Sequence, residues 1–222
     1  THNHNLTKEK FDEDLGIKRF IFSKFKEKDL LCDATHIINS IPPVNNQDIV
    51  YNYLNSIGFK SLKKLKWFGY LSSTSVYGNH NGKWVNEKTK LEPTSLRGKN
   101  RKHIEENYLR IHEEFNIPIH IFRLPGIYGP KRSVIEKLIS GNKIFVSKEK
   151  HFFSRIHVED IASAIIQSFK NVTPGEIFNV SDNFPCGSKE VSLFAAKLLK
   201  INDIVFKNVK SPEISTRVKE FY

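Results

Sequence analysis

The stretch Phe68-Gly69-Tyr70-Leu71-Ser72-Ser73-Thr74-Ser75 begins with apolar residues and ends with four hydroxyl-bearing ones. Its first six residues predict a short buried strand, because an apolar run of this length that stops at polar residues is typical of a parallel sheet. Two further strands are predicted around it. Thr35–Ile41 precedes it and stops at Pro42-Pro43, and Ile117–Arg123 follows it and ends at Pro125-Gly126.

Helical periodicity fills the segments between the strands. In Gly98–Phe115 the apolar residues Ile104, Tyr108, Ile111 and Phe115 recur at helical spacing. The other predicted helices are Asp48–Gly58, Ser133–Ser140, Glu159–Phe169 and Ser188–Leu199, and the other predicted strands are Ile17–Phe22, Lys143–Val146, Ile156–Val158 and Ile177–Val180. This alternation predicts an α/β fold in which helices cover both faces of a parallel sheet.

Three of the predicted strands end in residues that let a ligand come close to the backbone. The ends are Ser40-Ile41-Pro42-Pro43, Ser72–Ser75 and Leu124-Pro125-Gly126, and all carry small, hydroxyl-bearing or Pro/Gly residues. Each could be an ordinary transition from a strand to a loop without any ligand. Together, at the edge where parallel sheets bind their ligands, they favour a ligand crevice.

The charge balance is basic, with a formal net charge of +11. One interpretation is attraction to phosphate, and the other is a lysine-rich surface in water. We favour the second, because lysines such as Lys60, Lys63, Lys64 and Lys66 are dispersed and form no basic stripe with aromatic residues between them. We therefore do not expect nucleic acid as a partner.

Other bulk features are those of a protein in a reducing compartment. The two cysteines, Cys32 and Cys186, cannot build a disulfide framework, and no apolar run reaches the length of a membrane span. We therefore expect a cytoplasmic protein without a membrane partner. The sequence contains no methionine, which predicts a fragment or a processed piece of a longer protein.

Four blocks of sequence, in this order, resemble the extended short-chain dehydrogenase/reductase superfamily. They are Tyr70–Gly78, Phe122–Pro130, Arg155–Ala162 and Gly175–Val180. The variant Ser-Ile-Pro-Pro loop at Ser40–Pro43 is similar to an atypical, NAD-dependent epimerase/dehydratase-like branch of it.

The resemblance implies a partial Rossmann-type sheet with a small C-terminal substrate lobe. Residues 1–130 and 156–181 would form an incomplete NAD(P)-binding domain, and residues 131–155 and 182–222 the substrate lobe. The family's Gly-x-x-Gly-x-x-Gly turn, which cradles the pyrophosphate, is missing from the sequence. NAD or NADP would thus be bound by a longer form, with segments absent at both ends of this chain.

The family's Tyr-x-x-x-Lys pair is also missing. Aligning Pro93 with the family's proline puts Arg97 at the tyrosine position and Arg101 at the lysine position. An arginine stays protonated and cannot cycle as a general acid or base. Ser73 matches the family's third catalytic position, the hydroxyl that binds the substrate oxygen.

The resemblance assigns two groups of ligand contacts. The expected cofactor-binding residues are Ser40, Ile41, Pro42, Ser72, Arg101, Leu124, Pro125 and Gly126, and the expected substrate-binding residues are Arg97, Tyr77, Arg132 and His157. A purely structural role remains open for several of them, because Tyr77 suits a packed turn and His157 suits the start of a helix. No histidine or cysteine spacing indicates a metal site.

Two functions remain open. The first is an NAD(P)-binding epimerase/dehydratase-like protein that acts on a small, anionic substrate with a non-standard acid or base. The second is a catalytically silent module, for cofactor sensing or scaffolding, that keeps the pocket. Oligomeric state is not predicted.

Overall fold

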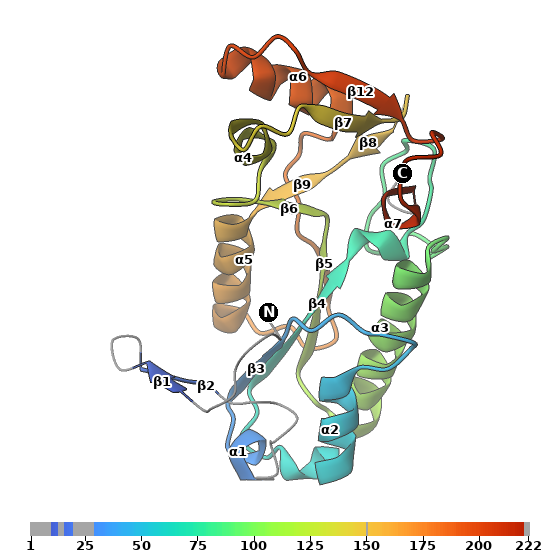
Figure 1. Cartoon of the computed structure of the whole chain (residues 1–222). Helices are drawn as coiled ribbons and strands as arrows, with labels where there is room; N and C mark the ends of the chain where they lie inside the picture. The colour runs from blue at the N-terminus through green and yellow to red at the C-terminus, as the bar shows by residue number, and fades with distance from the viewer. Residues whose placement is uncertain (1–9, 13–15, 20–28, 150, 220–222) are drawn as a thin grey trace.

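A four-stranded parallel sheet forms the centre of the computed structural model, which describes residues 10–12, 16–19, 29–149 and 151–219. Its strands lie in the order β10-β5-β4-β3 (Figure 1). They are β3 (His36–Asn39), β4 (Trp67–Ser73), β5 (Ile119–Leu124) and β10 (Ile177–Asn179). The prediction that β3, β4 and β5 are parallel neighbours is confirmed.

The register of these strands brings their carboxyl ends to one edge of the sheet. Asn39 lies opposite Tyr70, and Ser73 lies opposite Leu124. The segments that follow Asn39, Ser73 and Leu124 therefore leave the sheet on the same side, as predicted for the three strand ends.

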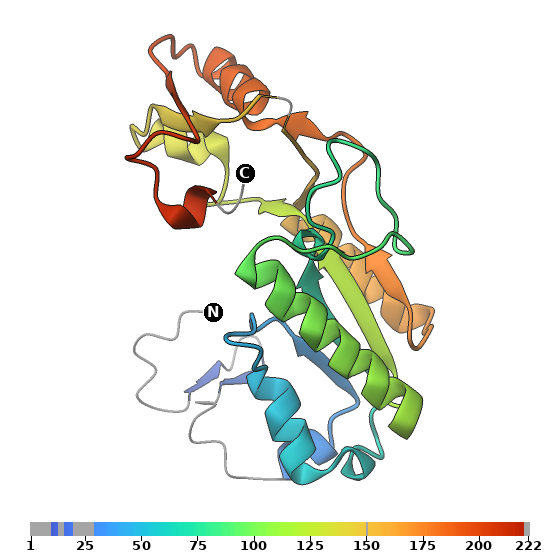
Figure 2. The same cartoon turned by 90° about the vertical axis from the view of Figure 1, so that its right-hand side faces the viewer.

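Helices cover both faces of the sheet. α2 (Ile49–Ile57) and α3 (Leu96–Phe115) lie on one face, and α5 (Val158–Lys170) lies on the other (Figures 1 and 2). Because side chains alternate along a strand, Phe68 and Tyr70 pack towards α2 and α3, whereas Trp67 packs towards α5. The two hydrophobic clusters formed in this way fix the three layers.

The two helices at the candidate site begin at side-chain caps. Asp48 accepts hydrogen bonds from the backbone N–H groups of Val50 and Tyr51, and Ser95 accepts one from Gly98. α3 therefore starts two residues before the predicted Gly98. A Cβ at Gly98 would lie 2.5 Å from the carbonyl oxygen of Ser75, so only glycine lets α3 pack against η3 (Thr74–Val76), the turn that follows β4.

The C-terminal lobe, as we name it, is built from α4 (Val134–Ile139), β7 (Ile144–Ser147), α6 (Ser188–Leu198) and β12 (Val205–Asn208). Its elements share a hydrophobic cluster of their own, around Leu138 and Phe145. β6 (Gly126–Tyr128) and β9 (Arg155–His157) pair in parallel between this lobe and the main sheet (Figure 1).

Several short elements complete the described residues. They are β1 (Lys10–Asp12), β2 (Ile17–Arg19), α1 (Asp29–Cys32), η2 (Phe59–Ser61), β8 (Phe152–Phe153), β11 (Cys186–Gly187) and α7 (Thr216–Lys219). The strand predicted for Ile17–Phe22 is β2, which pairs antiparallel with β1 outside the main sheet, and residues 20–22 lie outside the described residues. None of the described helices has the length and apolar character needed to cross a membrane.

Candidate functional site

The loop after β3 carries the predicted cofactor contacts Ser40, Ile41 and Pro42, and a buried polar network holds it in place. Asn39, 1% exposed, accepts a hydrogen bond from the backbone N–H of Ile41 at 3.0 Å. Its side-chain amide donates to Asp48 at 2.7 Å and to the hydroxyl oxygen of Tyr108 at 2.9 Å. Burial raises the pKa of Asp48 above its ordinary value. The loop is thus tied to α2 and α3 where it leaves the sheet.

Ser72 and Ser73 at the end of β4 face different surroundings. Ser72 is 3% exposed and donates a hydrogen bond of 2.5 Å to Glu105 of α3, so its hydroxyl is turned into the protein. Ser73 is half-buried and accepts a bond of 3.2 Å from the backbone N–H of Ser75. This bond leaves the hydroxyl hydrogen of Ser73 for a ligand.

A buried ion pair lies directly beneath this edge. Arg123 of β5 and Glu105 of α3 are each 2% exposed at the side chain, with Nη2 and Oε2 2.7 Å apart. Nη1 of Arg123 also donates to the hydroxyl oxygen of Tyr77 at 2.9 Å. Burial disfavours the charged form of Arg123, but its bonds to Glu105 and Tyr77 outweigh burial and raise its pKa. The pair fastens α3 to the sheet.

Tyr77 belongs to this network and not to an open pocket. It is 2% exposed, and its hydroxyl donates to Asn179 of β10 at 2.7 Å while accepting from Arg123. Both partners lie within the protein. We therefore assign Tyr77 a structural role, and its position gives no support to the predicted substrate contact.

Arg97 and Arg101 lie one turn apart on the same side of α3, as predicted. Arg101 is half-buried, and its Nη1 donates to the carbonyl oxygen of Leu71 at 2.8 Å. Arg97 is exposed. Tyr70, on β4 beneath this part of α3, is buried, and its hydroxyl lies beside Arg101. Burial raises the pKa of Tyr70, so it stays protonated.

The third strand end leads into β6 and the C-terminal lobe. Leu124 is buried, and Pro125 and Gly126 are half-buried where the chain turns into β6. At the end of β6 the ring centroids of Tyr128 and His157 are 5.2 Å apart.

His157 also caps α5. Its Nδ1 accepts a hydrogen bond from the backbone N–H of Glu159 at 3.3 Å. Arg132 is exposed, and its backbone forms a reciprocal bridge with Gly129. The predicted substrate contacts Arg132 and His157 thus lie on the lobe side of the site, away from the Tyr77 network.

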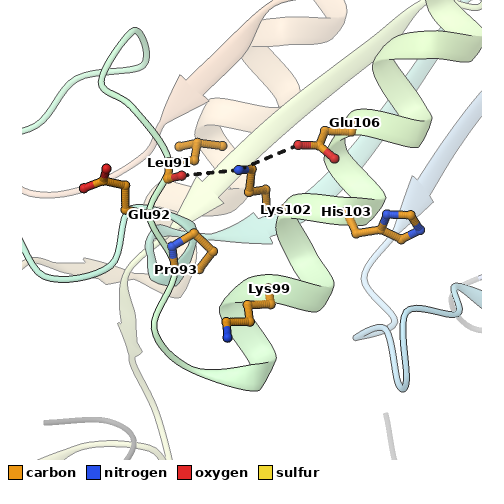
Figure 3. Close-up of a pocket in the computed structure, with 7 residues that line it drawn as sticks. All are labelled: Leu91, Glu92, Pro93, Lys99, Lys102, His103 and Glu106. Atoms are coloured by element: carbon orange, nitrogen blue, oxygen red, sulfur yellow. Dashed lines mark hydrogen bonds and ion pairs between the residues drawn. The ribbon is translucent and has the colours of Figure 1, made fainter.

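A cavity of about 430 Å³ lies beside the first turns of α3, on the side opposite Arg97 and Arg101. Figure 3 shows its lining. Its lining residues are Leu91, Glu92, Pro93, Lys99, Lys102, His103 and Glu106. Within it, Lys102 donates to the carbonyl oxygen of Leu91 at 3.3 Å and lies 3.9 Å from Glu106. Successive helical residues turn by about 100°, so Lys99 and Lys102 point away from the side that carries Arg97 and Arg101. The cavity is therefore separate from the predicted ligand site at the strand ends.

Sequence reasoning missed two features of this site. The Glu105–Arg123 pair joins residues of a helix and a strand, and no local motif marks it. Asn100, 5% exposed, has a side-chain oxygen without a hydrogen-bond partner among the described residues. The one feature of the sequence that points to Asn100 is its position three residues after Arg97, which places the two side chains next to each other on a helix. Within the described ranges no cluster of three or more His, Cys, Asp or Glu side chains suits a metal ion.

Curated relatives of this chain are dehydratases of nucleotide sugars. The dTDP-D-glucose 4,6-dehydratase of Dictyostelium discoideum is 27% identical over 199 residues, which cover 78% of this chain and 44% of the relative. The human enzyme of the same name is 25% identical over 167 residues, covering 68% of this chain and 47% of the relative. The chain thus spans less than half the length of either relative.

Solved structures share the fold over most of this chain. A functionally unknown conserved protein from Silicibacter pomeroyi DSS superposes with a TM-score of 0.79 at 36% identity, covering 85% of this chain and 66% of that protein. UDP-glucuronic acid 4-epimerase from Bacillus cereus, in complex with NAD, gives a TM-score of 0.71 at 19% identity, covering 86% of this chain and 68% of the epimerase.

The sequence pattern of one protein family matches residues 44–181, which contain α2, α3, β4, β5, α5 and β10. This match covers more than half of the chain. It also contains Ser73, Arg97 and Arg101 at the carboxyl edge of the sheet. The chain therefore belongs to the NAD dependent epimerase/dehydratase family.

Proposed function

We propose that this chain carries the nicotinamide side of an NAD(P) site in an epimerase/dehydratase-like protein with a small, anionic substrate. The observation that carries the proposal is the shared edge of the sheet. Ser73 is the last residue of β4, Ser40 and Gly126 lie just beyond β3 and β5, and the hydroxyl hydrogen of Ser73 is available to a ligand. A bound nicotinamide would supply hydride transfer at this edge.

The residues present fit one half of the dinucleotide. A Cβ at Gly126 would have its nearest neighbour at 3.5 Å, so the backbone there leaves room, and Arg101 keeps N–H groups that could bind a ribose hydroxyl. The loop Ser40–Pro42 and the turn Leu124–Gly126 would flank the nicotinamide. No glycine-rich turn exists in the sequence to cradle a pyrophosphate, so we assign the chain no adenosine side.

The protein's own groups would bind and orient the substrate. Ser73 would donate a hydrogen bond to the reacting oxygen, and Arg97 would bind an anionic group. Arg132 and His157, on the side of the site that leads to the C-terminal lobe, would contribute further contacts to the substrate. Relatives named for dTDP-D-glucose and UDP-glucuronic acid support an anionic sugar derivative as the substrate class.

Arg97 cannot transfer a proton at the position that the family gives to tyrosine, because a guanidinium keeps its proton at every working pH. Any turnover therefore uses another acid or base. Arg97→Ala should then weaken substrate binding and leave the pH profile of turnover unchanged, whereas loss of a general acid would remove one limb of the profile.

A second function follows from the arginine at the position that the family gives to tyrosine. If the cationic Arg97 has replaced proton transfer altogether, the chain is a catalytically silent cofactor-sensing or scaffolding module. Hydride exchange between labelled NADH and an added sugar nucleotide separates the two functions, because only the enzyme exchanges label.

Saturation-transfer NMR with NADH tests the proposed site. We expect weak binding, above the low-micromolar range, in which nicotinamide protons receive more saturation from the protein than adenine protons do. Arg101→Ala should reduce that contact, and Arg110→Ala, an exposed arginine on the outer side of α3, serves as the control. Equal or stronger saturation of adenine, or low-micromolar binding, would show that the pocket has been misplaced.

A further inference from the structure

The first turns of α3 carry three polar side chains on one side. Arg97, Asn100 and Arg101 stand at positions i, i+3 and i+4, which neighbour one another on a helix surface. On this side, Arg101 reaches the end of β4, where its Nη1 donates to the carbonyl oxygen of Leu71. The residues of α3 that line the cavity of Figure 3, such as Lys99 and Lys102, lie on the other side. The three side chains thus form one cluster, which we call the Arg-Asn-Arg cluster.

The acceptor in this cluster is unsatisfied. Asn100 is 5% exposed, and its side-chain oxygen has no hydrogen-bond partner among the described residues. A buried acceptor without a partner destabilises a fold, so buried amides are normally bonded. A ligand hydroxyl that donates to this oxygen would remove the deficit.

The donors in the cluster are also underused. The guanidinium of Arg97 makes no hydrogen bond or ion pair with the described residues, and that of Arg101 contacts two neutral groups, the carbonyl oxygen of Leu71 and the hydroxyl of Tyr70. Two guanidinium groups one turn apart repel each other unless an anion lies between them.

The neighbouring carboxylates do not supply that anion. Glu105, one turn further along α3, is bound to Arg123 and Ser72. Asp48 is bound to Asn39 and to the first backbone N–H groups of α2. The charge of the arginine pair is therefore left for a ligand.

We propose that the Arg-Asn-Arg cluster is a receptor for a phosphate or carboxylate that carries a neighbouring hydroxyl, as in a phosphorylated or acidic sugar. The two arginines bind the oxyanion, and Asn100 accepts the hydroxyl. The inference rests on the proposed function for the location of the ligand and adds the chemistry that recognises it. The oxyanion can belong to the substrate or to the dinucleotide.

Calorimetric titration with glucose 6-phosphate, inorganic phosphate and glucose tests the receptor on the chain as it exists. Glucose 6-phosphate should bind more tightly than either simpler probe. Arg97→Ala should weaken its binding by about 10-fold or more, because a charge-assisted bond is lost. Arg110→Ala removes the same charge from the outer side of α3 and should change binding by less than about 2-fold.

Asn100→Ala separates a hydroxyl contact from a structural role. It should lower the preference for glucose 6-phosphate over inorganic phosphate, with little effect on phosphate itself. A change that only loosened α3 would weaken both probes in parallel. Arg101→Lys, which keeps the charge, should bind more weakly than the wild type and more tightly than Arg101→Ala, and thermal melts check that each variant is folded.

NADH titrated in the presence of glucose 6-phosphate identifies the source of the oxyanion. Simultaneous binding assigns the receptor to the substrate, and mutual displacement assigns it to the dinucleotide. Failure of NADH to bind, with Arg97-dependent binding of glucose 6-phosphate intact, contradicts the proposed function and leaves the receptor standing. The receptor itself is refuted if glucose 6-phosphate does not bind, or if Arg97→Ala and Arg110→Ala weaken it equally.

Discussion

Arg123 and Glu105 form an ion pair in which neither side chain is more than 2% exposed, and in which all three guanidinium nitrogens of Arg123 have acceptors. The pair joins β5 to α3 directly beneath the strand ends. Two residues near the carboxyl end of β4 also bond to the pair. Ser72 donates to Glu105, and Tyr77 accepts from Arg123. The position of α3, and hence of Arg97 and Arg101, depends on this contact.

Glu105→Gln should destabilise the fold by about 3–5 kcal/mol, because it leaves the charge of Arg123 buried without a counter-ion. Urea unfolding followed by circular dichroism measures the loss. Glu106→Gln, at the exposed neighbouring position, should cost less than about 0.5 kcal/mol. Equal effects of the two substitutions would mean that the buried pair does not hold α3.

Gly98→Ala should destabilise the protein by about 1–3 kcal/mol, although alanine is the better helix former. Its Cβ would lie 2.5 Å from the carbonyl oxygen of Ser75 and 2.9 Å from Cβ of Pro93, so α3 or the turn after β4 must shift. Lys99→Ala at the next, exposed position is the control and should have little effect. A stability gain in Gly98→Ala, seen as a raised melting temperature, would contradict this account of the packing.

Tyr77→Phe should cost about 1–3 kcal/mol of stability, because Arg123 loses an acceptor and Asn179 loses a donor inside the protein. It should leave glucose 6-phosphate binding unchanged, since the hydroxyl is turned inward. Tyr128→Phe, at an exposed ring, should be nearly neutral in stability. A large loss of ligand affinity in Tyr77→Phe with normal stability would restore Tyr77 as a substrate contact.

Because His120 is buried, we expect the stability of the folded protein to fall in mild acid. Its Nε2 accepts from the backbone N–H of Thr173 at 3.1 Å, so its proton lies on Nδ1, which faces the carbonyl oxygen of Pro118 at 3.0 Å. Burial lowers the pKa of His120 from 6.5, so the unfolded chain binds the proton more readily than the folded one. Its contribution to stability is therefore present above pH 6.5 and is lost as the pH falls from 6.5 through the lowered pKa.

Urea midpoints measured across this pH range check the His120 prediction. His120→Gln lowers stability at all pH values but should flatten the decline below pH 6.5, compared with the wild type. His103→Gln, at an exposed position, is the control and should leave the pH dependence of the urea midpoint unchanged. An equally steep decline in His120→Gln would assign the acid sensitivity to other groups.

The sequence determined the elements and the edge at which they end. Apolar runs that stop at Ser40 or at Ser72-Ser73, and the helical spacing of Ile104, Tyr108 and Ile111, are local patterns that depend on backbone geometry and burial. They predicted β3, β4 and α3 within a few residues, and the shared carboxyl edge followed from parallel pairing.

Only the tertiary structure decided which side chains are left for a ligand at that edge. Ser72 and Ser73 are adjacent serines that the sequence does not distinguish. α3 covers Ser72 and leaves Ser73 half-buried, because neighbouring residues on a strand face opposite sides. Tyr77 was predicted as a contact and is engaged by Arg123 and Asn179, the second of which lies 102 residues away. Such contacts form where distant segments pack together, and their geometry is absent from any local stretch of sequence.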